Sequence, residues 1–113
     1  MTVNRLQSAT LMVDTGATTT LLRPLVLNRL AVSLGEAPRR RMFVVGGRSV
    51  EVALIKLALE VGSATVDNLE AGVADVFPGA HDVDGLLEAD FFRRFKMVLE
   101  TTARRMTLEP LAP

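Results

Sequence analysis

The sequence predicts an all-β protein that contains one or two short helices. Two observations favour this fold class. β-prone runs recur along the chain with turn residues between them at short intervals, and only two short segments have helical spacing. Strands at this density are typical of a closed β-barrel or a sandwich.

The composition fits a single domain that spans residues 1–113. This length supports one hydrophobic core but not two. Hydrophobic residues make up 49% of the chain and charged residues 23%, which is ordinary for a globular protein. Thirteen basic and thirteen acidic residues cancel, so no net field attracts nucleic acid or an anionic membrane. Tyr and Trp are absent, which leaves little for stacking on bases.

Cysteine content and hydropathy bear on the compartment. The chain has no Cys, which excludes disulfides, thiolate nucleophiles and Cys-bound metals. A cysteine-free fold suits the cytoplasm and the periplasm alike, so localisation stays open. No apolar stretch approaches the roughly 20 residues needed to cross a bilayer, and residues 1–10 lack a signal-peptide core. We expect a soluble chain without a membrane segment, although a longer parent protein can carry a targeting segment.

The N-terminal part is expected to contain two strands, one helix and a loop. Residues 8–13 and 18–22 are β-prone, and the first of these strands leads into Asp14. A short helix is expected to begin at Pro24, with apolar positions at Leu25, Val26, Leu27 and Leu30. Residues 35–41 are predicted to form a solvated loop that contains Arg39, Arg40 and Arg41.

The middle of the chain predicts a hairpin followed by longer strands. Two β-prone runs within residues 42–54 flank Gly46 and Gly47, which is a good hairpin signal. Strand character continues to residue 61, and a Gly-Ser turn then leads to further extended chain at 64–76.

The C-terminal part is expected to form a loop, a helix and a closing hairpin. A Pro/Gly loop at residues 78–85 precedes the apolar pair Leu86-Leu87. A helix at residues 90–96 would turn Phe91, Phe92 and Phe95 toward the core. Residues 97–100 and 104–109 then pair across a polar turn.

The most informative segment is residues 11–17, Leu-Met-Val-Asp-Thr-Gly-Ala. Asp14 ends an apolar strand, so its charge has lost hydration on the strand side and needs compensation. Gly16 lets the chain turn sharply and brings backbone N–H groups close to the carboxylate, and Thr15 offers a hydroxyl group. A plain turn after a strand is the alternative interpretation, since Asp and Gly are favoured turn residues.

This segment resembles the Asp-Thr-Gly-Ala signature of retropepsin-type aspartic proteases. The hairpin at 42–54 is similar to the flap of that family, and residues 84–92 resemble the apolar pair and short helix that pack behind its catalytic loop. Residues 95–108 resemble the closing strands of bacterial members, so a bacterial source is expected. The resemblance covers residues 9–108 in the expected order and implies the retropepsin-like acid-protease fold.

The resemblance implies an active site made by two copies of the chain. Such enzymes use two carboxylates that share one proton across a water molecule, and this chain supplies one, Asp14. A homodimer would place Asp14 of each copy on the two-fold axis. Thr15 is expected to hydrogen-bond across that axis, and Gly16 to give the carboxylate a backbone donor. The implied function is that of an aspartic endopeptidase, with no metal and no other cofactor.

The implied substrate is an extended peptide or protein that is apolar around the scissile bond. Val45, Gly46 and Gly47 would form the flap tip, whose backbone can pair with such a peptide. Ala17 is also assigned to substrate binding. Apolar subsite candidates, each of which also suits a plain core position, are Leu22, Val44, Val50 and Leu86.

Two features, Glu88 and the length before Asp14, depart from the family pattern, and Ala17 bears on the expected pH dependence. Glu88 stands where the family usually has Gly, and it is expected either to cap the helix at 90–96 or to face the catalytic loop and disturb its charge. Only thirteen residues precede Asp14, so the dimer interface is expected to be smaller than in viral enzymes, or built differently. Ala17 replaces the Ser of many cellular relatives and removes a hydroxyl donor, which predicts activity nearer neutral pH.

Two alternatives to the protease remain open. A catalytically inactive module with the same fold would serve dimerisation or peptide binding. In a monomeric protein, Asp14 would be a structural turn residue. The retained Asp-Thr-Gly-Ala favours the enzyme, because a scaffold has no need for a dehydrated acid on a symmetry axis.

A metal site is not favoured. The lone His81 lies near four acids, Asp75, Asp82, Asp84 and Asp90. Metal ligands need fixed spacing on rigid elements, whereas these residues lie in and around a Pro/Gly loop. We interpret them as solvated loop acids, and a single loop histidine also makes a Ser-His-Asp triad unpersuasive.

Overall fold

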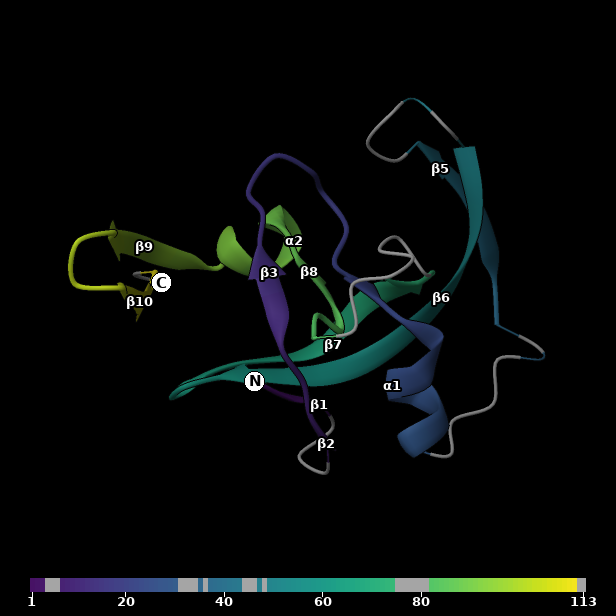
Figure 1. The fold of residues 1–113 in the computed structure, drawn as a ribbon, viewed down its shortest axis with the longest axis horizontal. Coiled ribbons are helices and arrows are strands. Elements are labelled where there is room, and N and C mark those ends of the chain that lie inside the picture. The colour runs from purple at the N-terminus through teal and green to yellow at the C-terminus, as the bar shows by residue number, and fades with distance from the viewer. Residues whose placement is uncertain are drawn as a thin grey trace.

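The computed structural model describes residues 1–3, 7–30, 35, 37–43, 47, 49–74 and 82–111. Its strands and helices are short, apart from one long hairpin (Figure 1). In chain order they are β1 (Thr2–Val3), β2 (Gln7–Ser8), β3 (Leu11–Val13), β4 (Leu21–Leu22), α1 (Pro24–Arg29), β5 (Arg39–Phe43), β6 (Ser49–Val61), β7 (Ala64–Val73), β8 (Gly85–Leu87), α2 (Ala89–Phe92), β9 (Phe95–Glu100) and β10 (Arg105–Pro110).

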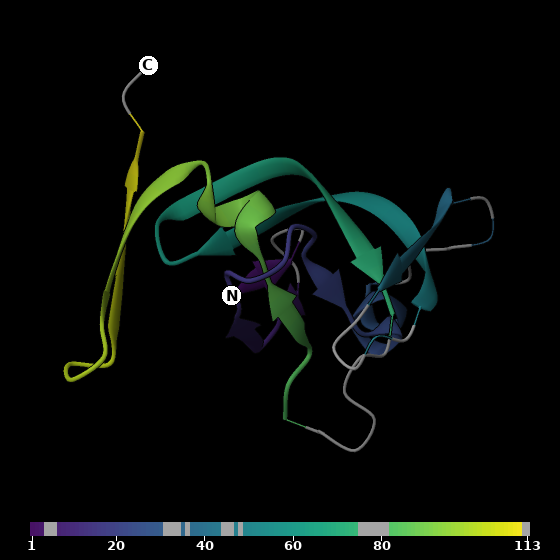
Figure 2. The same ribbon diagram turned by 90° about the horizontal axis from the view of Figure 1, so that it is seen from above.

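Within the described residues, eight strands form one sheet in the order β2-β1-β6-β7-β4-β8-β3, and β5 also pairs with β6. Strands β6 and β7 curve strongly, so the sheet curls around its core (Figures 1 and 2). Strands β9 and β10 form a separate two-stranded sheet that projects from one end of the molecule (Figure 2). The all-β prediction with short helices is confirmed.

The long β6–β7 hairpin forms the centre of the fold. Its tight turn at Gly62 and Ser63 follows from a left-handed backbone at Gly62, with φ of 60°, and joins the paired residues Val61 and Ala64. Successive side chains of β6 point to opposite faces. Ala53, Leu57 and Leu59 therefore pack in the main core, with Val26, Leu22 and Phe91 among others. The opposite face packs in a smaller cluster with Leu21, Val52 and Leu54.

Strand β8 lies between β3 and β4 and brings the candidate site together. It runs parallel to β3, with Leu11, Met12 and Val13 opposite Gly85, Leu86 and Leu87. It runs antiparallel to β4 on its other side. The backbones approach so closely that a Cβ on Gly85 would lie 2.1 Å from the carbonyl oxygen of Leu21. Only glycine fits at this position.

Several predicted boundaries were wrong. Residues 18–20 bend instead of extending, and only Leu21–Leu22 pair as a strand. The prediction of a solvated loop at 35–41 was wrong for Arg39–Arg41. These residues begin strand β5 and pair with residues 51–53 of β6, although their side chains stay exposed. Strand β7 ends at Val73, and β1 was not predicted at all.

The second helix is shorter than predicted. It ends at Phe92, and Phe95 already begins β9. The aromatic cluster nevertheless forms, because the Phe91 ring packs 5.1 Å from the Phe95 ring and 5.7 Å from the Phe92 ring, between centroids. The tight turn at Arg93 and Arg94 therefore places Phe95 beside Phe91, as a further helical turn was expected to do.

Among the described residues, no helix is long and apolar enough to cross a membrane.

Replacing Gly85 by Ala is expected to cost about 3 kcal/mol or more in the free energy of unfolding, because the new Cβ forces β4 away from β8. Gly62→Asn is the matched control: nothing lies within 4 Å of a Cβ there, and Asn tolerates the left-handed backbone at a cost of about 1 kcal/mol or less. Urea unfolding measures both. Equal losses in the two variants would contradict the close approach.

Candidate active site

Asp14 lies directly after β3, at the start of a loop that leads to β4. Its backbone N–H donates to the carbonyl oxygen of Leu87 at 2.9 Å, which extends the β3–β8 pairing by one step. The N–H of Gly16 donates to Asp14 Oδ1, also at 2.9 Å. A Cβ on Gly16 would lie 3.2 Å from that oxygen, so glycine gives the N–H room to approach. Asp14 is half-buried at this position.

The loop of residues 14–20 is held from behind by the segment of residues 87–90. In its middle, the N–H of Ala17 donates to Glu88 Oε2 at 3.2 Å, and the carbonyl oxygen of Ala17 accepts from the N–H of Ala89 at 3.2 Å. Thr15 and Ala17 are exposed. These contacts fix the loop while leaving its outer side open.

Thr20 and Asp90 close the loop at its far end. Asp90 accepts from the Thr20 N–H at 2.8 Å, from the Thr20 hydroxyl at 2.6 Å and from the Phe91 N–H at 2.9 Å. The Thr20 oxygen in turn accepts from the N–H of Glu88 at 3.1 Å. Both side chains are buried, so each is satisfied as burial requires. The interpretation of Asp90 as a solvated loop acid was wrong, because Asp90 anchors α2 to the loop of residues 14–20.

Glu88 is the most unusual residue of the site. Its side chain is 1% exposed. Oε2 accepts the bond from Ala17, and among the residues that the structure describes no donor reaches Oε1. Glu88 occupies the predicted N-cap position of α2, but its side chain makes no capping hydrogen bond. The alternative prediction, that Glu88 faces the loop that carries Asp14, is confirmed, because its side chain accepts the bond from Ala17 in that loop.

The surroundings of Glu88 favour its neutral form. Burial raises the pKa of Glu88 from its usual 4.5 to about 7, helped by the side-chain hydrogen bond with Asp14 and by the negative charges of Asp14 and Asp90. The bond from the Ala17 N–H acts the other way and lowers the pKa. At mildly acidic pH this site therefore holds a buried, protonated carboxyl group beside Asp14.

The other predicted site residues are only partly described. Val45 and Gly46, predicted for the flap tip, and Val44 lie outside the described residues. Gly47 is exposed and has a left-handed backbone with φ of 78°, which suits a hairpin tip. In Figure 1 the end of β5 and the start of β6 stand on the same side of the molecule as the loop after β3.

The apolar subsite candidates divide into two groups. Leu86 and Val50 are half-buried and pack against the smaller cluster. Leu22 is fully buried in the main core, so the subsite prediction for it was wrong. A β4 side chain that points into the core has no path to a substrate.

The acids predicted to lie in the loop before β8 have different positions. Asp75 and His81 lie outside the described residues. Asp82 is exposed, whereas Asp84 accepts from the Thr10 N–H at 2.8 Å and pairs with Arg29 at 3.8 Å. Asp84 therefore has a structural role, and the solvated-loop interpretation was wrong for it. No group of three metal-ligating side chains occurs within the described part of the chain.

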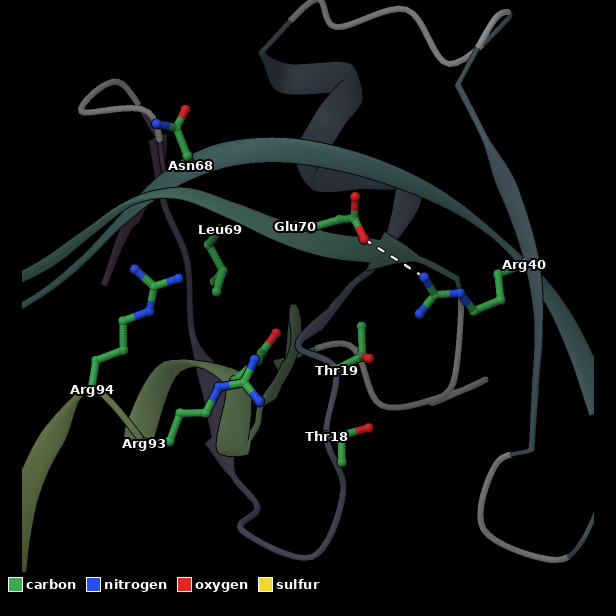
Figure 3. Close-up of a pocket in the computed structure, with 9 residues that line it drawn as sticks. Thr18, Thr19, Arg40, Asn68, Leu69, Glu70, Arg93 and Arg94 are labelled. Atoms are coloured by element: carbon green, nitrogen blue, oxygen red, sulfur yellow. Dashed lines mark ion pairs between the residues drawn. The ribbon is translucent and has the colours of Figure 1, made fainter.

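A polar pocket of about 270 Å³ opens beside the second half of the loop (Figure 3). Its lining includes Thr18, Thr19, Arg40, Glu70, Arg93 and Arg94. Arg40 pairs with Glu70 at 3.7 Å across its mouth, as the dashed line shows. Asp14 does not line this pocket, so the pocket is separate from the candidate active site.

The fold and the site together define a class. A curled β-sheet presents Asp-Thr-Gly-Ala on a loop after β3, and a parallel neighbouring strand and a short helix hold that loop from behind. This is the architecture of retropepsin-like aspartic proteases. Residues 1–91 match the family model described as aspartyl protease, and the chain belongs to this family.

Solved structures support the assignment. A retropepsin-like aspartic protease from Rickettsia conorii is 25% identical in sequence, with a TM-score of 0.66, and the match covers 87% of this chain and 71% of that one. The retroviral protease-like domain of Ddi1 from Leishmania major shares the fold at 15% identity, with a TM-score of 0.58, over 98% of this chain and 90% of that domain. Among curated proteins, none matches this sequence.

The pKa of Glu88 predicts how stability depends on pH. Between pH 4.5 and 7 the folded protein keeps a proton on Glu88 that the unfolded chain has lost, so the free energy of unfolding falls as pH rises. The difference between the two pKa values corresponds to about 3 kcal/mol. Glu88→Gln has no proton to lose at this position. Its free energy of unfolding, relative to that of the wild type, should therefore rise by about 3 kcal/mol between pH 4.5 and pH 8.

Urea unfolding at several pH values tests this prediction. Glu100→Gln is the matched control, because it removes an exposed carboxyl group in place of a buried one. Parallel stability profiles for the wild type and Glu88→Gln would show that Glu88 ionises normally.

Proposed function

We propose that this chain is an aspartic endopeptidase that works as a homodimer. The observation that carries the proposal is Asp14, a partly exposed carboxyl group on a rigidly anchored loop, with the Gly16 N–H as a donor. One copy supplies one such carboxyl group, and a second copy supplies the other across a two-fold axis. Family membership supports protease chemistry, and the dimer follows from what that chemistry requires.

In this proposal the two Asp14 side chains share one proton across a bound water molecule. One carboxylate removes a proton from the water, which attacks the peptide carbonyl carbon, while the other carboxyl group protonates the carbonyl oxygen. Two like charges at such close range do not both ionise easily, so the single proton belongs to the pair. Thr15 would hydrogen-bond across the axis and brace the two loops, as in the family that the chain resembles.

The projecting β9–β10 hairpin supports a dimer. One face of this two-stranded sheet packs Met97, Met106 and Leu108 against the main core. Val98 and Leu99 in β9 are exposed, as is Leu111 directly after β10, the last two by more than half. Strand β1, in contrast, already pairs with β6 and β2 within its own copy. The hairpin is therefore the better candidate for the contact between copies, in keeping with an interface that differs from that of viral enzymes.

The β5–β6 hairpin supports binding of an extended, apolar peptide. Phe43 ends β5 and is 80% exposed, next to the predicted flap tip of residues 45–47. Met12 and Val13, directly before Asp14, are also exposed. We assign Ala17, the flap tip and Leu86 to substrate binding on this basis.

Asp14→Asn tests the proposed function. The variant keeps the size of the side chain but removes the general base, so cleavage of a peptide library should fall by at least about 10³-fold, with an unchanged thermal unfolding curve. A statine-type transition-state inhibitor should block the wild type. Mass spectrometry of the products measures cleavage.

Asp82→Asn is the matched control, because Asp82 is exposed in a loop before β8 and should leave cleavage unchanged. Equal activity of wild type and Asp14→Asn would exclude the dyad. Inhibitor binding without cleavage would favour the inactive peptide-binding module.

A further inference from the structure

The register of two parallel strands places two acids side by side. Leu11, Met12 and Val13 pair with residues 85–87, so the next residue on each strand, Asp14 and Glu88, leaves the sheet at the same edge. The Asp14 N–H donates to the carbonyl oxygen of Leu87, the residue before Glu88, so the pairing continues up to the two acids. The juxtaposition is therefore a property of the fold and not of a flexible surface contact.

Burial separates the roles of the two acids. Glu88 is 1% exposed, so it reaches neither a peptide nor a bulk water molecule, and it cannot serve as the second catalytic carboxylate. Asp14 is partly exposed. Whatever Glu88 contributes to the reaction, it contributes through Asp14 and through the loop that carries it.

The surroundings of Glu88 require a proton. The parallel register places the Asp14 carboxyl group beside Glu88, where it raises the pKa of Glu88, and two ionised carboxylates have no donor between them. Oε2 accepts from Ala17, and in the described part of the chain no donor reaches the buried Oε1. A charged carboxylate buried with one 3.2 Å bond would be poorly compensated, whereas a carboxylic acid becomes a donor itself.

The charged groups that act on Glu88 are both acidic. Asp14 approaches it from the loop after β3, and Asp90 from α2. Asp90 is fully engaged by Thr20 and the Phe91 N–H, so it offers no donor to Glu88. Within the described residues, no cation offsets the charge of an ionised Glu88. A proton on Glu88 itself is therefore the remaining way to compensate its burial.

We propose that Glu88 is a positioning residue that stays protonated and donates its hydrogen bond to the Asp14 carboxylate of the same copy. This inference rests on the proposed function for its effect on activity. Glu88 holds the backbone of Ala17 through Oε2, and the parallel register sets its carboxyl group beside that of Asp14. Each copy carries its own Glu88 proton, distinct from the single proton that the two Asp14 side chains share.

The proposal predicts an alkaline limit on activity. Above pH 7 Glu88 loses its proton, the donor to Asp14 disappears, and two adjacent anions repel each other at the base of the catalytic loop. Glu88→Gln keeps an N–H donor of similar length but does not titrate. Its kcat should therefore persist at high pH, with an unchanged KM.

The first test measures the proton directly and does not depend on catalysis. Carbon-13 NMR of the glutamate carboxyl groups should show one resonance, absent from Glu88→Gln, that titrates near pH 7 in the wild type. In Asp14→Asn the same midpoint should move downward, since the neighbouring anion is gone. A midpoint near the usual 4.5 in the wild type would overturn the proposal.

The second test compares pH profiles of cleavage for the wild type, Glu88→Gln and Glu88→Ala. At each pH, the activity of Glu88→Gln is divided by that of the wild type. This ratio should be about tenfold higher at pH 8 than at pH 5, because only about one tenth of Glu88 stays protonated at pH 8. Glu88→Ala should lose kcat at every pH. Parallel profiles for wild type and Glu88→Gln would overturn the proposal. If neither the wild type nor any variant cleaves while Glu88 titrates near pH 7, the proposed function fails. The proposed hydrogen bond from protonated Glu88 to Asp14 then still stands.

Discussion

The parallel pairing of β3 with β8 is the interaction on which the candidate site depends. It brings the end of one strand, Asp14, beside the end of another, Glu88, although 73 residues separate them in the chain. The contact requires Gly85, where the backbone of β4 leaves no space for a side chain. From there the segment at 87–90 holds the loop that carries Asp14 at its start, middle and end, through Leu87, Glu88 with Ala89, and Asp90.

The sequence was sufficient for the fold class and for the strand that leads into Asp14. Alternation, turn residues and the Asp-Thr-Gly-Ala signature are local features, so they predicted the strands, the hairpins and Asp14. Boundaries such as the end of α2 were predicted less well, because the Phe91 and Phe95 contact is satisfied by a turn as well as by a helix. The anchoring of Thr20 by Asp90 was missed, since it joins residues 70 positions apart. Three consecutive threonines after Ala17 were the only local signal.

Glu88 shows how one buried acid redistributes charge behind the loop that carries Asp14. A glycine at this position would leave the back of the loop apolar, whereas Glu88 adds a second carboxyl group that has to keep a proton. The consequence is that stability and the state of Asp14 depend on the same proton. Acidic conditions favour both the folded protein and the donor to Asp14, which sets this chain apart from a design in which a hydroxyl group supplies the donor at every pH.

The central claim is that catalysis needs Asp14 from two copies, and mixing experiments test it most directly. Wild type and Asp14→Asn are unfolded together and refolded so that copies exchange at random. Activity per total protein should fall with the square of the wild-type fraction, to about one quarter in an equal mixture, because mixed dimers lack one carboxylate. A linear fall, to about one half, would mean that a single copy is active by itself and would contradict the shared dyad.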